Sequence, residues 1–273
     1  MRRVWLRRLT ITSGLIAGGC ALFWIEPHAA FGPLEWAAPG VVWRVPTREP
    51  VVALSFDDGP SPSFTPQVLG ILQRHGAHAT FFLIGRRAAE HPDIVDAIKR
   101  GGHEIGNHYD TPGTALKASE AEFVDRLERA GSVLGLEGPG KLFRPPGGLL
   151  WPSQLRLARE RGYTCVLGSA YPHDPSHPPT WYIRWLVTKN LEPGAIVILH
   201  DGIADPTRTI AALPEILEAG ARKGLQFVSV GRLLASSRGS SDVTTQKMRR
   251  AASRTRPLAR GSRTRAGGGH RLR

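Results

Sequence analysis

The chain has 273 residues, 41% of them hydrophobic, and a formal net charge of +13. The hydrophobic content is ordinary for a globular protein, and the length allows one barrel-sized domain with tails. The charge lies at the ends, because residues 27–235 hold 21 basic and 21 acidic side chains, whereas residues 236–273 hold 11 basic side chains and one acidic. The neutral central part argues against a specific nucleic-acid partner. The basic tail at 236–273 lacks an apolar period and is expected to be disordered.

The N-terminus combines basic residues with an apolar run. Two arginine pairs precede 17 apolar or small residues from Leu9 to Ile25, a length at the lower limit for a membrane span. We assign residues 1–31 as an N-terminal membrane anchor or signal segment, with the basic end in the cytoplasm. A cleaved secretory signal, a lipoprotein signal around Cys20 and a buried soluble helix are the alternatives. All but the last predict an extracytoplasmic domain, membrane-anchored or secreted.

Between these ends, short apolar runs alternate with helical patterns, and we assign residues 45–235 to one domain. Such runs, bounded by Gly or Pro, are typical of strands buried on both faces. The expected strands are 51–56, 79–84, 103–106, 141–143, 163–168, 195–199 and 225–228. The expected helices are 65–75, 86–100, 119–134, 152–161, 180–190 and 208–222. Repeated strand–helix units predict a parallel sheet with helices outside it. The pattern leaves open whether the seven strands form an incomplete barrel or an open doubly wound sheet.

Ionisable side chains follow five of the expected strands. They are Asp57 and Asp58, His108 and Asp110, Arg144, His173 and Asp174, and His200 and Asp201. Because functional sites of parallel α/β proteins lie at the carboxyl ends of the strands, we expect these side chains to form one site. A Gly-Pro turn after Asp58 would let both neighbouring carboxylates face that site. Two close carboxylates repel each other unless a cation lies beside them, and a metal ion and Arg144 would supply the charge.

Four motifs carry a family resemblance. Residues 55–60, 102–108, 143–147 and 196–202 resemble, in the same order, motifs of the polysaccharide deacetylases, the NodB-homology carbohydrate esterases. The resemblance implies an α/β fold, a distorted seven-stranded (β/α) barrel in a single domain. It also implies a metal-dependent hydrolase that removes N-acetyl groups from an N-acetylglucosamine-containing carbohydrate, chitin-like or peptidoglycan, and releases acetate.

The resemblance further implies a divalent metal cofactor, with zinc as the expected ion. Asp58 and His108 match the family's metal ligands, and nitrogen and carboxylate donors suit a catalytic zinc. The family's third ligand is a His four residues after the first, but this chain has Pro112 there. Asp110 is the nearest substitute. The alternative is a site with two protein ligands and water.

The same resemblance implies the proton-transfer groups. Asp57 is the general base that takes a proton from water, and Arg144 holds it ionised through charge-assisted hydrogen bonds. His200 is the general acid that protonates the leaving amine. Asp174, which matches the fourth motif, orients His200.

The substrate-binding residues are less clear from the motifs. The resemblance places Pro146 and Gly147 of the third motif beside the substrate. In the fourth motif, Tyr171 stands where the family has its first Asp, and Pro175 stands where it has Trp. We therefore assign Tyr171 as a substrate contact in a loop that departs from the family pattern.

Two further functions compete with deacetylation of an N-acetylated glycan. One is a metal-dependent amidohydrolase that acts on a non-carbohydrate C–N bond. The other is a membrane-anchored pseudoenzyme that only binds glycan, its metal site weakened by Pro112. The presence of Asp57, Arg144 and His200 argues against the pseudoenzyme, since a pure binder needs neither a base nor an acid.

Overall fold

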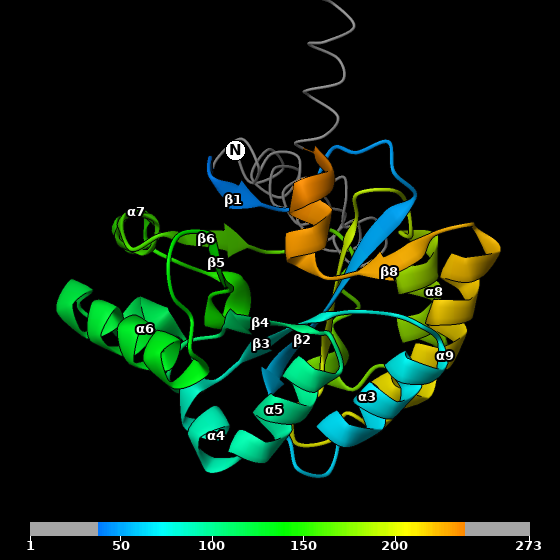
Figure 1. The fold of residues 1–273 in the computed structure, drawn as a ribbon, viewed down its shortest axis with the longest axis horizontal. Helices are drawn as coiled ribbons and strands as arrows, with labels where there is room; N and C mark the ends of the chain where they lie inside the picture. The colour runs from blue at the N-terminus through cyan, green and yellow to red at the C-terminus, as the bar shows by residue number, and fades with distance from the viewer. Residues whose placement is uncertain (1–37, 238–273) are drawn as a thin grey trace, which may run out of the picture. The chain divides into compact units, whose positions relative to one another are not determined.

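The computed structural model describes residues 38–237, and eight strands of this region form one parallel sheet (Figure 1). The strands are β1 (Val41–Val42), β2 (Val51–Gly59), β3 (Thr80–Leu83), β4 (Glu104–Asn107), β5 (Lys141–Phe143), β6 (Tyr163–Val166), β7 (Ile196–His200) and β8 (Gln226–Val228). The seven expected strands are confirmed as β2 to β8. The sequence reading missed β1, a two-residue strand that pairs with β6 and is too short to show a pattern.

The sheet closes into a distorted barrel. Its strand order is β1-β6-β5-β4-β3-β2-β7, and β8 pairs with the first residues of β2. Beyond β6, Ala170 forms a bridge with Val197 of β7. The Ala170 amide donates to Ile196 at 3.1 Å, and the Ile198 amide donates to Ala170 at 3.0 Å. This bridge joins the β6 side of the sheet to β7, so the barrel is confirmed over the open doubly wound sheet.

Helices surround the sheet, and Figure 1 shows α3, α5 and α9 on one side and α6 and α7 on the other. The helices are α3 (Thr65–Arg74), α4 (Gly85–Glu90), α5 (Pro92–Arg100), α6 (Glu120–Leu134), α7 (Pro152–Glu160), α8 (Thr180–Lys189) and α9 (Thr207–Arg222). The helix expected at 86–100 is two helices, because Pro92 begins α5 and disfavours helical backbone at His91.

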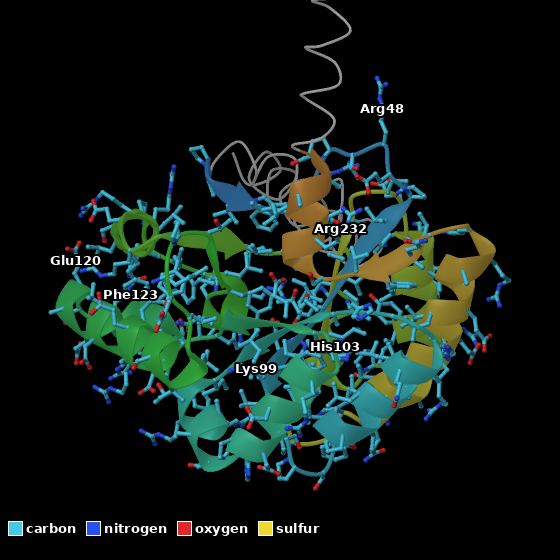
Figure 2. All side chains as sticks on the ribbon, viewed as in Figure 1. Arg48, Lys99, His103, Glu120, Phe123 and Arg232 are labelled. Atoms are coloured by element: carbon cyan, nitrogen blue, oxygen red, sulfur yellow. The ribbon has the colours of Figure 1, made fainter. Side chains whose placement is uncertain are left out.

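Packing of α6 fixes the chain that follows β4. Figure 2 labels Phe123 on α6, whose fully buried ring stacks on Tyr109 at 5.8 Å and meets Phe143 at 6.1 Å. The Asn107 side chain donates to the Leu127 carbonyl of α6 at 2.9 Å and accepts from the Tyr109 amide at 2.7 Å. These contacts hold the residues on either side of His108.

The predictions for the two ends lie almost wholly outside the described residues. The N-terminal segment at 1–31 is outside them, and of the tail at 236–273 only residues 236 and 237 are included. Both assignments therefore stay predictions. Within 38–237, none of the helices has the length and apolar character needed to span a membrane.

Candidate active site

A β-bulge at the end of β2 brings two neighbouring carboxylates to one cleft. Asp57 pairs with Phe82 and Gly59 pairs with Leu83, so Asp58 is an extra residue on its strand. Its φ of +69° lies in the left-handed region. In a regular strand Asp57 and Asp58 would face opposite sides, and the bulge re-aims one of them. The expectation that both face the site is met by this bulge, which begins before the Gly-Pro turn.

Most of the predicted site residues line a single cleft of about 660 Å³ at the carboxyl ends of the strands. Those that line it are Asp57, Asp58, His108, Arg144, Pro146, Gly147, Tyr171 and His200. They come from the ends of β2, β4, β5, β6 and β7, which lie far apart in the sequence. Of the residues that the strand-end pattern selected, the structure brings five to this cleft: Asp57, Asp58, His108, Arg144 and His200.

The Asp57 carboxylate is held by a buried guanidinium. Arg144 Nη1 donates to Asp57 Oδ1 at 2.5 Å and to Ser55 Oγ at 2.8 Å. The other guanidinium nitrogens donate to the Val166 and Leu167 carbonyls at 3.1 and 3.2 Å. Burial lowers the pKa of Arg144, and the charge of Asp57 opposes that shift. The pair is charge-assisted and fully enclosed, so Asp57 is oriented as an ionised carboxylate.

His200 is the predicted general acid, and Asp174 holds it from behind. Asp174 accepts from His200 Nδ1 at 2.9 Å, from the His200 amide at 2.8 Å and from Thr209 Oγ1 at 2.9 Å. Burial lowers the pKa of His200, but Asp174, Asp57 and Asp58 outweigh it and raise that pKa to about 9. The imidazole is therefore cationic at neutral pH. Its Nδ1 is engaged, which leaves Nε2 as the nitrogen available to the cleft.

Asp58 and His108 form the part of the cleft that could hold a metal ion. His108 Nδ1 lies 2.9 Å from the Arg144 carbonyl oxygen and donates to it, which leaves Nε2 as the nitrogen that faces Asp58 and that carries the lone pair when the imidazole is neutral. His108 Nε2 lies 3.4 Å from Asp58 Oδ1. Ligands about 2.0–2.2 Å from one zinc ion have such a separation. The two donors fit one edge of a metal site.

The electrostatics around Asp58 also favour a ligand. Burial raises the pKa of Asp58, but the hydrogen bond and charge of His108, and then His200 and Arg87, outweigh burial and lower the pKa below its usual value. The carboxylate is therefore ionised at neutral pH, as metal binding requires.

Asp110 lies elsewhere. Its carboxylate is 3.7 Å from Arg129 of α6 and faces Gly85, where an added Cβ would come within 3.1 Å of Oδ1. Tyr109 has a φ of +75°, which turns the chain between His108 and Asp110. Pro112 does line the cleft but has no donor atom. Within residues 38–237 no group of three His, Cys, Asp or Glu side chains could hold an ion. The structure thus does not bring Asp110 to the Asp58–His108 pair, and the geometry favours two protein ligands.

Asp201 is a second ionisable residue that stays out of the cleft. It is fully buried, and Thr65 Oγ1 donates to its Oδ2 at 2.5 Å. Burial raises the pKa of Asp201 to about 7. Its place behind the Asp57–Gly59 strand end makes it a structural contact.

Tyr171, Pro146 and Gly147 form walls of the cleft, as predicted for substrate contacts. The Tyr171 ring lies 5.9 Å from the His200 ring and 4.4 Å from His173. Burial, followed by nearby carboxylates, raises the pKa of Tyr171, so its hydroxyl stays protonated and can donate. Gly147 has a φ of +70°, which keeps the turn after Arg144 close to the opening.

Sequence reasoning missed Arg87, a cleft residue on α4. Its guanidinium donates to the backbone carbonyls of Asp58 and Gly202. It follows β3 by four residues and falls within the expected helix at 86–100, so the strand-end rule that selected the other polar residues passed over it. Six other lining residues have apolar side chains that no sequence pattern marked as part of a site: Trp43, Leu149, Leu167, Ile198, Ile203 and Ala204.

Comparisons with known proteins agree with this geometry. The family model described as polysaccharide deacetylase matches residues 44–166. A peptidoglycan-N-acetylglucosamine deacetylase of Bacillus cereus is 41% identical over 197 residues, which cover 71% of this chain and 92% of the relative. A chitooligosaccharide deacetylase of Bradyrhizobium is 33% identical over 190 residues, 64% of this chain and 87% of the relative. A solved peptidoglycan N-acetylglucosamine deacetylase, in complex with 4-naphthalen-1-yl-N-oxidanyl-benzamide, has a TM-score of 0.70 and 31% identity, covering 75% of this chain and 98% of its own.

Proposed function

The chain belongs to the polysaccharide deacetylase family, and we propose that it hydrolyses the N-acetyl group of N-acetylglucosamine in a polymeric glycan, peptidoglycan before chitin. One observation carries this proposal. A carboxylate bound to a buried guanidinium and a cationic imidazole bound to a buried carboxylate face the same cleft. That arrangement supplies one proton acceptor and one proton donor, as hydrolysis of an amide requires.

Asp57 is the base in this mechanism. It takes a proton from a water molecule while the water oxygen bonds to the carbonyl carbon of the acetamide. Arg144 keeps the carboxylate charged and fixes its direction through the 2.5 Å hydrogen bond. The product of this step is a tetrahedral oxyanion.

His200 is the acid. As the tetrahedral species collapses, the C–N bond breaks and the proton on His200 passes to the leaving nitrogen. Acetate and a free amino sugar are released, and the proton gained by Asp57 balances the one lost by His200. Asp174 favours the cationic imidazole beforehand, because it accepts from Nδ1 at 2.9 Å and lies buried behind the ring.

Asp58 and His108 would hold a divalent ion, and zinc is the expected ion. When bound, such an ion polarises the acetamide carbonyl and acidifies water. Within the protein, the Arg144 carbonyl orients His108, so the residue that orients the base also orients this ligand. Pro112 leaves the ion with fewer protein donors than the family pattern supplies.

The shape of the cleft supports a polymeric substrate. A neighbouring cavity of about 810 Å³ shares five lining residues with it: Trp43, Pro145, Gly148, Leu149 and Leu167. The cleft therefore has a second recess beside it, which would give room for sugars beyond the one that reacts. Peptidoglycan stands first because the peptidoglycan deacetylase relative is 41% identical and the chitooligosaccharide deacetylase relative 33%.

The location of the enzyme is part of the same proposal. The arginine pairs and apolar run before residue 31 would keep the domain outside the cytoplasm, where peptidoglycan lies. Fusion of residues 1–37 to alkaline phosphatase, which is active only after export, tests this. Export predicts that the fusion has phosphatase activity. It also predicts that this activity is lost after charged residues are placed in the apolar run. An inactive, cytoplasmic fusion contradicts it.

Acetate release by the full-length chain is the test of function. Peptidoglycan and N-acetylglucosamine oligomers would be offered to protein stripped of metal and then resupplied with zinc, cobalt or manganese. We expect metal-dependent release that Asp57→Asn abolishes and that the surface variant Arg86→Met leaves intact. Glycan binding without release by any metal-loaded form would contradict the proposal and indicate the glycan-binding pseudoenzyme. Release of acid from a non-carbohydrate amide alone would indicate the amidohydrolase.

A further inference from the structure

Arg87 occupies a position in the cleft that the proposed mechanism does not use. It lies on the short helix α4 and lines the cleft together with Asp58, His108 and His200. Its guanidinium does not meet a carboxylate at salt-bridge distance among the described residues. Nη1 instead donates to two backbone carbonyls, those of Asp58 and Gly202.

One of these carbonyls belongs to the bulge at the end of β2, and the other belongs to the loop that follows the adjacent strand β7. β2 and β7 are paired up to Asp57 and His200, and Asp58 and Gly202 come just after those partners. The bulge and the loop are in backbone contact, because a Cβ on Gly202 would lie 2.0 Å from the Asp58 oxygen. Only glycine allows this approach. Arg87 then bonds the bulge and the loop at the point where they meet.

Asp58 needs such support because of its backbone conformation. It has a Cβ and a φ of +69°, and residues other than glycine adopt this region only where the surroundings impose it. The same conformation, within the bulge, places the Asp58 carboxylate in the cleft beside His108. A residue that holds the Asp58 carbonyl therefore also decides where its carboxylate lies.

We infer that Arg87 is a positioning residue, which fixes the left-handed backbone of Asp58 against the Gly202 loop and so keeps the Asp58 carboxylate in place as a cation ligand. This inference rests on the proposed function for the identity of the cation. It carries particular weight in this chain, because Pro112 supplies no donor and the ion depends on Asp58 and His108.

The chain offers a matched control in the neighbouring arginine. The Arg86 side chain is exposed, and the Arg86 backbone amide donates to the Asp110 carbonyl at 3.1 Å. Arg86→Met and Arg87→Met remove the same charge from the same helix turn. Arg87→Lys keeps the charge but has a shorter side chain and no planar guanidinium, so it should hold the two carbonyls less well, and it remains informative if Arg87→Met folds poorly.

Two measurements on the full-length chain test the inference without substrate. Isothermal titration with Co²⁺ should show at least tenfold weaker binding by Arg87→Met, an intermediate loss for Arg87→Lys and no change for Arg86→Met. Crystal structures should show Asp58 leaving its positive φ in Arg87→Met and keeping it in Arg86→Met. Acetate release should then fall in kcat for Arg87→Met, with KM little changed.

An Arg87→Met protein that keeps both its Co²⁺ affinity and the left-handed Asp58 overturns the inference. So does an equal loss of affinity in Arg86→Met, since that would be a general charge effect. Failure of the unmodified chain to bind Co²⁺ would instead contradict the proposed metal site. The conformation of Asp58 in the Arg87→Met crystal structure would still decide whether Arg87 positions it.

Discussion

The cleft has two halves that differ in how firmly their side chains are held. The acid–base half consists of Asp57 with Arg144 and His200 with Asp174. Its two ion pairs are 2.5 and 2.9 Å long, and the supporting Arg144 and Asp174 are almost completely buried. The proton-transfer groups are therefore fixed in direction before any substrate arrives.

The metal-binding half consists of Asp58 and His108, and it is held less firmly. The two donors are 3.4 Å apart, the Asp58 side chain is 29% exposed, and Asp58 stands in a bulge. An ion must complete this half, whereas the acid–base half is complete without one. We therefore expect substitutions in the acid–base half to change catalysis and stability together. Substitutions in the metal-binding half should change ion affinity first.

Arg144→Met should have the largest effect. It leaves the buried carboxylate of Asp57 without its partner, and breaking a buried ion pair costs about 3–5 kcal/mol of unfolding free energy. Acetate release should fall by roughly 10²–10⁴-fold as the base loses its orientation. Urea unfolding and an acetate assay measure the two losses. Arg156→Met, which breaks an exposed pair with Glu160, is the control and should change stability by less than about 0.5 kcal/mol. Equal losses in the two variants would contradict the firm hold of this half.

Asp174→Asn should shift the pH dependence of activity. The charge of Asp174 is the largest influence that raises the pKa of His200 to about 9, so its removal should lower that pKa. The cationic acid is then lost at lower pH, and the alkaline limb of the kcat profile should move toward neutrality. A pH profile between 6 and about 10 measures this.

The same pKa has a consequence for stability. His200 has a pKa raised above its ordinary 6.5, so its contribution to stability is complete below 6.5 and is lost as pH rises through about 9. This alkaline loss should be smaller in Asp174→Asn, as urea unfolding at several pH values would show. If Asp174→Asn leaves the pH profile of kcat unchanged, His200 is not the acid.

Pro112→His tests the metal-binding half directly. Position 112 lines the cleft, so a donor there can reach the ion and should raise Co²⁺ affinity by about tenfold, or about 1.4 kcal/mol. Asp110→Asn should leave the affinity unchanged, because the Asp110 carboxylate faces Arg129 and Gly85. Titration of stripped protein measures both. A loss of affinity in Asp110→Asn would restore Asp110 as the third ligand.

Ser119→Ala should have the smallest effect. Ser119 caps α6 and forms a capping box with Glu122. Its loss should lower the thermal midpoint by about 2–4 °C and leave acetate release at 25 °C unchanged. A fall in Co²⁺ affinity would show that α6, through Phe123 and Tyr109, supports the metal-binding half directly.

Much of the fold could be predicted because its strands are buried on both faces. Runs such as 51–56 and 195–199 are almost wholly apolar and are followed directly by ionisable residues, so both their positions and the site beyond them were predictable. Barrel closure followed from the family resemblance and not from the strand pattern, because it depends on one bridge between Ala170 and Val197 that leaves no local pattern. β1, with two residues, was lost for the same reason.

The site was predictable where a residue's place follows from the end of a strand, and not where it follows from a turn. His108 comes directly after β4 and reaches the cleft. Asp110 is two residues further on, past the positive φ of Tyr109, and points to α4 and α6. Arg87 reaches the cleft from a helix, and its partners are backbone atoms of residues far away in the sequence. Such contacts arise from the fold and have no local signature.

Arg144 touches both halves of the cleft with different parts of one residue. Its side chain binds the Asp57 carboxylate, and its carbonyl oxygen faces His108 Nδ1. The spacing between the base and the cation ligand therefore depends on the conformation of a single arginine, whose buried side chain is held by its bonds to Ser55, Val166 and Leu167 as well as to Asp57. A core substitution that shifts the end of β5 would carry Asp57's partner and His108's partner along together. Errors in packing should consequently displace the base and the ligand in concert, and leave their mutual distance intact.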